Sequence, residues 1–231
     1  MTRFYTIALD GSTYHGSVAV LRDSQVVAER SLGGDEVGSG KRVAGRGDAL
    51  MPAIAECLKE AGIRRDAIAR IVCGEGPGSF TSLRVAGSVA KGLAVGYAVD
   101  LYAVSSLVLT VTGARPTLPA GEYLSVLDAM RGEYFAARVT LLPGRTVIQP
   151  APTTLVGIEE LMELSEREPL VQVVGPGQRF DFHPHARGVA PLLESMVERG
   201  PVDLASWEPG YGRPAEAQVR WEAAHGRPLQ G

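Results

Sequence analysis

The stretch from residue 69 to residue 96 constrains the fold more than any other part of the chain. It begins with Ala69–Cys73, a short apolar run with β-branched residues, bounded by glycine, which predicts a buried strand. The loop that follows, Gly74–Gly78, contains glycines and a proline, so the backbone can turn sharply there. A helical pattern then runs over Thr81–Gly96, and a hydroxyl group at its start, such as that of Ser79, can cap the first turn.

The predicted helix has a broad apolar face. Its polar side chains fall on one narrow stripe, made of Thr81, Arg84, Ser88 and Lys91. The apolar arc spans about 220°, whereas an ordinary surface helix has an apolar stripe of roughly 100°. Small residues such as Gly87 and Gly92 allow another element to approach closely. Two interpretations stay open, a central helix buried in its own domain or a helix shared with a partner subunit.

A glycine loop before a helix can also bind phosphate, because helix N-termini attract anions. A P-loop requires Lys and then Ser or Thr after its last glycine, but here Gly78 is followed by Ser79 and Phe80. The spacing of a Rossmann loop is also missing. The pattern therefore favours a structural turn.

These residues resemble the signature of the bacterial TsaB (YeaZ) family. The matching residues are Gly76, Pro77, Gly78, Ser79, Phe80, Thr81, Leu83 and Arg84, followed by Ala90–Ala94. Ser82 is a departure, since the family usually has glycine there. The segments 128–135 and 209–213 are also similar to family segments. The resemblance implies an α/β protein with two RNase H-like lobes in the actin-like ATPase (ASKHA) fold, which we expect at residues 1–113 and 114–231.

The resemblance also implies a function. The family takes part in making threonylcarbamoyladenosine next to the tRNA anticodon, as a non-catalytic partner of the enzyme that transfers the threonylcarbamoyl group. The implied partners are that catalytic paralogue, TsaD, a small ATPase of the same pathway, TsaE, and a second copy of the chain. The resemblance implies contact with tRNA only through the complex, and we expect no cofactor.

Composition narrows the function classes. The chain has 231 residues and a net charge of −3, without the basic surplus typical of a protein that grips nucleic acid. Its two cysteines, Cys57 and Cys73, lie in apolar patterns without metal-ligand spacing, which is typical of buried thiols in a reducing compartment. We find no signal peptide and no apolar run of roughly 18 residues that would span a membrane, so we expect a cytoplasmic protein.

The N-terminal segments Phe4–Leu9, Val18–Leu21 and Val26–Arg30 predict an antiparallel meander. The first turn contains Asp10, Gly11, Ser12 and Thr13, which resemble the phosphate loop of actin-like kinases and ATPases. Hydroxyl and backbone N–H groups could hold phosphate there, and Asp10 could hold magnesium through water. A plain Asp-Gly hairpin turn is the other interpretation. A small-molecule kinase or ATPase that uses this loop is therefore the alternative function.

The remaining elements follow from periodicity and turn residues. Gly33–Gly47 predicts a glycine-rich loop, and Asp48 is a plausible N-cap for an amphipathic helix that ends near Gly62. Further predicted strands are 101–104, 123–127, 133–141, 146–148 and 170–174, and further predicted helices are 105–113, 158–166 and 191–199.

Complete catalytic or metal sites are not visible. His183 and His185 flank a proline without a third ligand, so a surface loop is favoured over a metal site. Ser79 and Ser82 have no evident base partner. Asp10 and Asp128 could meet between the lobes, but a two-metal site would need further acids. We expect no catalytic residue and no metal.

The two amphipathic helices suggest a surface for a partner. The predicted interface residues are Leu50, Ile54, Leu58, Val85 and Val89. Two such helices from each subunit would make a four-helix contact, which the resemblance also implies for the family. The same contact would be isologous in a homodimer.

Overall fold

The computed structural model of this protein describes residues 4–33, 49–143, 147–148, 152–213 and 225. The part of the predicted loop beyond Gly33 and the predicted N-cap at Asp48 lie outside the described residues. Within the described part of the chain, no helix is both long enough and apolar enough to cross a membrane.

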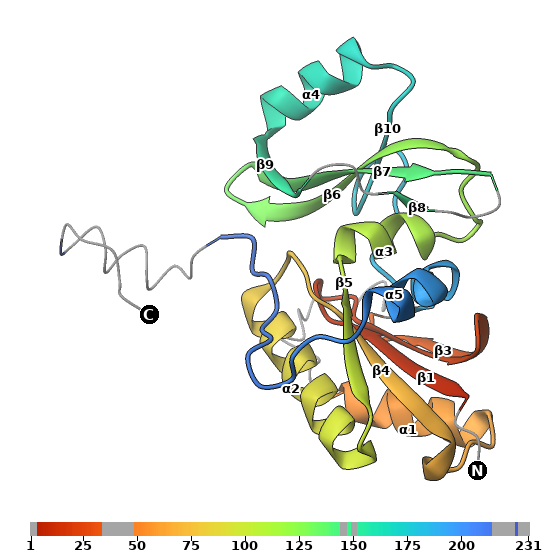
Figure 1. Cartoon of the computed structure of the whole chain (residues 1–231). Coiled ribbons are helices and arrows are strands. Elements are labelled where there is room, and N and C mark those ends of the chain that lie inside the picture. The colour runs from red at the N-terminus through yellow and green to blue at the C-terminus, as the bar shows by residue number, and fades with distance from the viewer. Residues whose placement is uncertain (1–3, 34–48, 144–146, 149–151, 214–224, 226–231) are drawn as a thin grey trace, which may run out of the picture.

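The first sheet has the strand order β3-β2-β1-β4-β5 (Figure 1). Its strands are β1 (Tyr5–Asp10), β2 (Ser17–Arg22), β3 (Gln25–Ser31), β4 (Ile68–Gly74) and β5 (Asp100–Val104). The first three pair antiparallel, which confirms the predicted meander, and β4 and β5 join β1 in parallel. Parallel pairing places the carboxyl ends of β1 and β4 side by side.

Two helices, both of which were predicted from the sequence, cover one face of this sheet. They are α1 (Leu50–Glu60) and α2 (Phe80–Tyr97), and the short 3₁₀ turn η2 (Arg65–Ala67) leads into β4. The sheet-facing side of α2 is made of Leu83, Ala86, Ala90, Leu93 and Ala94. The small side chains of Ala86, Ala90 and Ala94 let α2 lie close to the strands.

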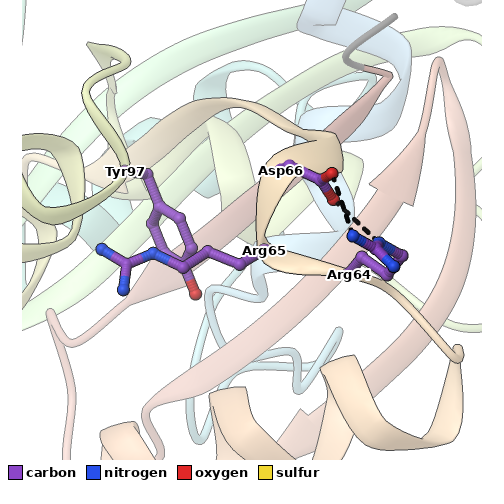
Figure 2. Close-up of a pocket in the computed structure, with 4 residues that line it drawn as sticks. All are labelled: Arg64, Arg65, Asp66 and Tyr97. Atoms are coloured by element: carbon purple, nitrogen blue, oxygen red, sulfur yellow. Dashed lines mark hydrogen bonds and ion pairs between the residues drawn. The ribbon is translucent and has the colours of Figure 1, made fainter. Parts of the chain in front are cut away.

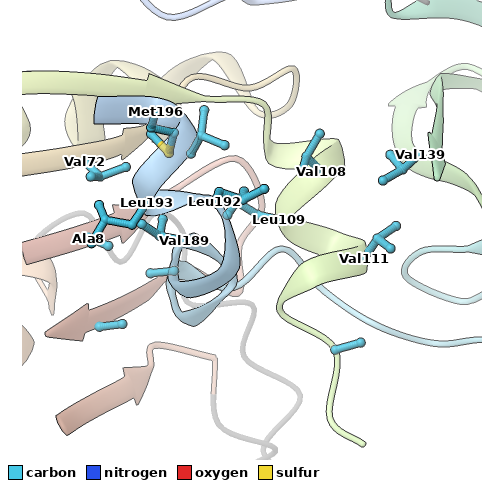
Figure 3. Packing of buried hydrophobic residues seen from close by; sticks show 14 of the residues in the cluster. Ala8, Val72, Val108, Leu109, Val111, Val139, Val189, Leu192, Leu193 and Met196 are labelled. Atoms are coloured by element: carbon cyan, nitrogen blue, oxygen red, sulfur yellow. The ribbon is translucent and has the colours of Figure 1, made fainter. Parts of the chain in front are cut away.

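The opposite face of the first sheet is covered by α3 (Ser106–Thr112) and by two segments from the second half of the chain. These two segments are η3 (Ala186–Leu192) and α5 (Leu193–Arg199). Figure 3 shows Val189, Leu193 and Met196 packed beside Ala8 and Val72 of the sheet. The division into lobes at residues 113 and 114 stays a prediction, but η3 and α5 belong to the core of the first sheet although they follow that boundary.

The second sheet has the order β10-β6-β7-β8, with β9 also paired to β7. Its strands are β6 (Gly121–Met130), β7 (Glu133–Leu141), β8 (Val147–Ile148), β9 (Thr154–Gly157) and β10 (Gln172–Val174), and α4 (Ile158–Arg167) follows β9. The hairpin between β6 and β7 turns at Met130, Arg131 and Gly132, all of which have positive φ. Strand β9 was not predicted, since its four residues form no clear alternating pattern.

A polar cluster attaches the start of η3 to the first sheet. The carboxylate of Glu29 on β3 accepts a hydrogen bond from Arg187 at 3.1 Å and pairs with Arg115 at 3.0 Å. The ring of His185 lies 3.2 Å from the Ser31 hydroxyl through Nε2, and its Nδ1 accepts from the Arg187 N–H at 3.1 Å. Because Nδ1 is an acceptor, the proton of the neutral ring is on Nε2.

This cluster predicts a pH dependence of stability. Burial, with the charges of Arg187 and Arg115, lowers the pKa of His185 to about 3. An unfolded histidine titrates near 6.5, so below that pH the unfolded chain binds a proton that the folded chain does not. We expect His185 to reduce the free energy of unfolding by about 2 kcal/mol between about pH 7 and pH 5.

Denaturant unfolding of the wild type and of His185→Gln at several pH values measures this contribution. The variant should show a flatter decline in the acid range, whereas His15→Gln, at an exposed position, should follow the wild type. Parallel curves for the wild type and His185→Gln would contradict the prediction.

Candidate functional site

The carboxyl ends of β1 and β4 form the natural crevice of this fold, since ligands of open α/β sheets bind beyond the carboxyl ends of parallel strands. Asp10 ends β1, Gly74 ends β4, and α3 begins beside them at Ser106. The sequence predicted a candidate nucleotide loop here, over Asp10, Gly11, Ser12 and Thr13. The site can therefore be assessed from the contacts of these residues.

Asp10 is fully buried, and both of its carboxylate oxygens have partners inside the protein. Oδ1 accepts from the hydroxyl of Ser12 at 2.7 Å and from its N–H at 3.0 Å. Oδ2 accepts from the Ser106 hydroxyl at 2.6 Å. Burial raises the pKa of Asp10, and the hydrogen bonds from Ser106 and Ser12 oppose that shift. The carboxylate thus joins β1 to α3 and does not face a site where a hydrated metal ion could reach it.

The two loops at the crevice close on each other. The Ser79 N–H donates to the Ser12 carbonyl at 2.7 Å. A Cβ at Gly78 would lie 2.1 Å from the same carbonyl oxygen, and one at Gly11 would lie 2.8 Å from Cβ of Ala86. The backbone that would have to surround a phosphate is thus packed against protein. Thr13 lies at the edge of this loop, where its hydroxyl accepts from the His15 N–H at 3.2 Å.

The glycine–proline loop and the start of α2 have structural partners as well. Gly76 has φ +95°, and its N–H donates to the Ser106 hydroxyl at 3.1 Å. Leu83 is buried, and Phe80 packs against Tyr211 with ring centroids 4.4 Å apart. Ser79 occupies the N-cap, but its hydroxyl donates to Ser82 Oγ at 3.1 Å and makes no capping bond, so the predicted side-chain cap is wrong.

Two further ionisable side chains, Glu75 and Cys73, lie in or next to this loop. Burial raises the pKa of Glu75, although Trp207 and Arg199 oppose the shift. Burial and the nearby charges of Asp10 and Glu75 raise the pKa of the Cys73 thiol, which is inert in that state. Acids with raised pKa values are frequent in active sites. In this protein, the side chains of Glu75 and Cys73 lie around Asp10, where the two loops pack tightly against each other.

The other candidate residues are apart from the site around Asp10. Asp128 is exposed and accepts from the Met130 N–H at 2.7 Å within its own hairpin, so its partners differ from those of Asp10. The rings of His15 and His183 lie 4.0 Å apart, while His185 binds Ser31. No cluster of three His, Cys, Asp or Glu side chains suited to a metal ion occurs in the described ranges of the chain.

A surface pocket of about 520 Å³ lies at the other end of the first sheet. It is lined by Arg64, Arg65, Asp66 and Tyr97 (Figure 2). Arg64 pairs with Asp66 at 3.2 Å, and the Arg65 guanidinium lies 5.4 Å from the Tyr97 ring centroid and donates to the Gly96 carbonyl. Both guanidinium groups of the pocket therefore already have partners within the protein, and none of the four side chains is a typical nucleophile.

The predicted partner residues differ in accessibility. Leu50 and Ile54 are each only 2% exposed and belong to the core between α1 and the sheet, so their prediction as contacts for a partner is wrong. They lie at the centre of the apolar arc of α1, which the sheet covers first. Leu58, Val85 and Val89 are half-buried at the edges of the core, and their role stays a prediction.

Several accessible residues of these helices were not among the predicted interface residues. The exposed positions with apolar or small side chains are Met51 and Ala55 on α1, and Gly92, Val95 and Gly96 on α2. Val95 is 68% exposed. A helical projection centred on Ala86 and Ala90 would have placed these α2 residues on the outer side, but the sequence does not say which side meets the sheet.

The hydrogen bonds of Asp10 predict that substitutions of Ser105 and Ser106 change the free energy of unfolding differently. Ser106→Ala removes the donor to Asp10 and the acceptor for Gly76, so we expect a loss of about 1–3 kcal/mol in the free energy of unfolding. The buried Ser105 hydroxyl makes no hydrogen bond, and Ser105→Ala should change stability little or increase it. Denaturant unfolding of both variants tests this, and equal stabilities would show that the Asp10 network contributes nothing.

Comparisons with known proteins agree with one another. A family model described as TsaD, tRNA N6-adenosine threonylcarbamoyltransferase, matches residues 46–188. The tRNA threonylcarbamoyladenosine biosynthesis protein TsaB of Bacillus subtilis is 26% identical over 236 residues, which cover 93% of this chain and 96% of that protein. TsaB of Escherichia coli is 30% identical over 131 residues, which cover 57% of this chain and 53% of that protein.

Solved structures support the same fold. YeaZ from Pseudomonas aeruginosa superposes with a TM-score of 0.72 at 24% identity, over 91% of this chain and 100% of that one. The architecture is the α/β actin-like (ASKHA) fold expected from the sequence. The chain spans about half the length of the Escherichia coli relative and almost the whole of the Bacillus subtilis one. Since the family model covers more than half of the chain, this protein belongs to the family that the model describes, and it is similar to the tRNA threonylcarbamoyladenosine biosynthesis proteins named TsaB.

Proposed function

We propose that this protein is a non-catalytic partner subunit of the enzyme that adds the threonylcarbamoyl group to the tRNA adenosine next to the anticodon. The observation that carries the proposal is the state of Asp10. The one carboxylate of the candidate phosphate loop is fully buried, and its two oxygens are occupied by Ser12 and Ser106. A chain whose crevice is filled by its own residues contributes to the pathway through its surface.

The surface that we assign to the catalytic paralogue is the outer side of α1 and α2. Gly92, Val95 and Gly96 are exposed on α2, next to the half-buried Val85 and Val89. A Cβ at Gly92 would meet nothing within 4 Å. Small residues on an exposed helix face allow a second helix to approach closely, which is the requirement for a helix–helix interface.

The other flank of α2 is covered within the chain. A Cβ at Gly87 would lie 3.0 Å from Cγ of Pro209, and Lys91 lies 5.9 Å from the Trp207 ring centroid. The partner face is therefore limited to the side that carries Ser88, Gly92 and Val95. Met51, 49% exposed on α1, extends the apolar surface.

The same face could serve in more than one assembly. In a homodimer it would make an isologous contact, and a paralogue of the same fold could replace one copy. TsaD is the catalytic paralogue in this proposal and TsaE the small ATPase that joins the complex. The chain would meet tRNA only through that complex, in the cytoplasm.

Substitutions at Gly92 test the surface. Gly92→Arg places a long cation on an exposed position with open space around it, so the fold should be preserved. We expect it to weaken binding to the catalytic paralogue by more than about tenfold, or about 1.4 kcal/mol. Isothermal titration calorimetry with the purified paralogue measures the affinity, and circular dichroism checks the fold.

Two controls accompany this test. Gly92→Ala should keep a small surface and increase stability by about 0.5–1 kcal/mol, because alanine favours the helix. Leu170→Arg, at a position that is 90% exposed in the second half of the chain, should bind like the wild type. A folded Gly92→Arg protein with unchanged affinity would exclude this face, and failure of the wild type to bind the paralogue would exclude the proposed function.

Nucleotide turnover separates this proposal from the kinase or ATPase alternative. We expect the isolated protein to show no significant ATP hydrolysis, since the Asp10 carboxylate is enclosed and no general base is placed beside it. Phosphate release by the purified wild type and by Asp10→Asn is the measurement. Robust turnover that is lost in Asp10→Asn would favour the enzyme.

A further inference from the structure

The segment Trp207–Arg213, here named the C-terminal strap, connects the two sheets on the side of α2. Figure 1 shows this blue segment running along α2 toward the second sheet. Its start belongs to the first sheet, since Trp207 packs into the core between α2 and that sheet. Its end belongs to the second sheet, since the Arg213 guanidinium donates to the Ala129 carbonyl and to Glu133 Oε2.

Each residue in the middle of the strap has a defined partner. Pro209 lies over Gly87 of α2, where a Cβ would be only 3.0 Å away. The Gly210 N–H donates to the Glu75 carbonyl at 2.7 Å, and Tyr211 packs on Phe80. The strap is thus held along the glycine–proline loop that follows β4.

The second sheet meets the strap at a position that only glycine fits. Gly212 has φ +73°, and a Cβ there would lie 2.5 Å from Cε1 of Phe135 and 2.8 Å from Cβ of Pro77. Phe135 on β7 therefore packs directly on the strap, and the Arg213 guanidinium lies 5.7 Å from its ring centroid. One short segment contacts α2, the loop after β4 and the β6–β7 hairpin in succession.

The two sheets also contact each other through α3. Ser125 on β6 donates to the Leu107 carbonyl at 2.7 Å, and Leu107 packs with Leu127 and Phe135. The strap lies at the other side of the site around Asp10, beside α2. The two sheets are thus joined on one side by α3 and by the core that they share with η3, and on the other side by the strap.

We propose that the C-terminal strap is a coupling element, which holds the β6–β7 hairpin of the second sheet against α2 and the loop after β4, so that its release loosens the hairpin. The strap couples α2 to the second sheet, so a change at one end alters the stability of the other. This inference does not depend on the partner or on the reaction of the complex, because it concerns contacts within one chain.

Hydrogen exchange of the full-length protein tests this coupling. Gly87→Val would push Pro209 and Trp207 away from α2, and we expect amides in the strap and in the hairpin at 128–134 to exchange roughly tenfold faster. Gly92→Val is the matched control, the same change on the same helix, where a Cβ meets nothing within 4 Å. It should leave both regions unchanged.

A second variant acts from the other end, in case Gly87→Val does not fold. Arg213→Gln removes the ion pair with Glu133 and should likewise speed exchange in both regions, while β1 and β4 stay protected. Arg167→Gln is its control, since Arg167 pairs with Glu163 at 3.1 Å on α4, away from the strap. If the strap amides exchange faster while the hairpin at 128–134 keeps its protection in the folded variant, the segment does not couple the sheets and the proposal is wrong.

Discussion

The contact between Asp10 and Gly74 is the constraint on which the rest of this structure depends. A Cβ at Gly74 would lie 1.9 Å from Oδ2 of Asp10, so the carboxylate occupies the space of a side chain that glycine lacks. This allows Asp10 to reach Ser106 and to join β1, β4 and α3 at one point. A buried carboxylate is costly without partners, and here three hydrogen bonds stabilise it.

Because the protein's own side chains fill the site around Asp10, we propose the accessible side of α1 and α2 as the functional surface. The loops that could have held a phosphate contact each other through Gly78 and Ser12. The exposed part of α2, around Gly92 and Val95, is the part that neither the sheet nor Trp207 and Pro209 cover. A chain built this way has a closely packed centre and an accessible helical face.

The second half of the chain stabilises the first half from two sides. On the face opposite α1 and α2, Val189 and Met196 complete the core, and His185, Arg187 and Glu29 form the polar anchor. On the side of α2, the segment ending at Arg213 returns to the β6–β7 hairpin. The two sheets are therefore not independent folding units, even though each has its own helices.

The sequence alone determined the local elements and their order. The meander, the strand before Gly74 and the helix after Phe80 follow from periodicity and glycine placement, which act over a few neighbouring residues. Tertiary structure decided which apolar residues stay accessible. Leu50 and Gly92 both lie on predicted helix faces, yet the sheet buries Leu50 and leaves Gly92 free. Tertiary structure also decided that Asp10 is buried, because its partner Ser106 is far away in the chain. In the same way it made His185 a neutral contact between distant segments, since its ring binds Ser31 and the Arg187 N–H. Burial depends on such distant contacts, and a local pattern does not contain them.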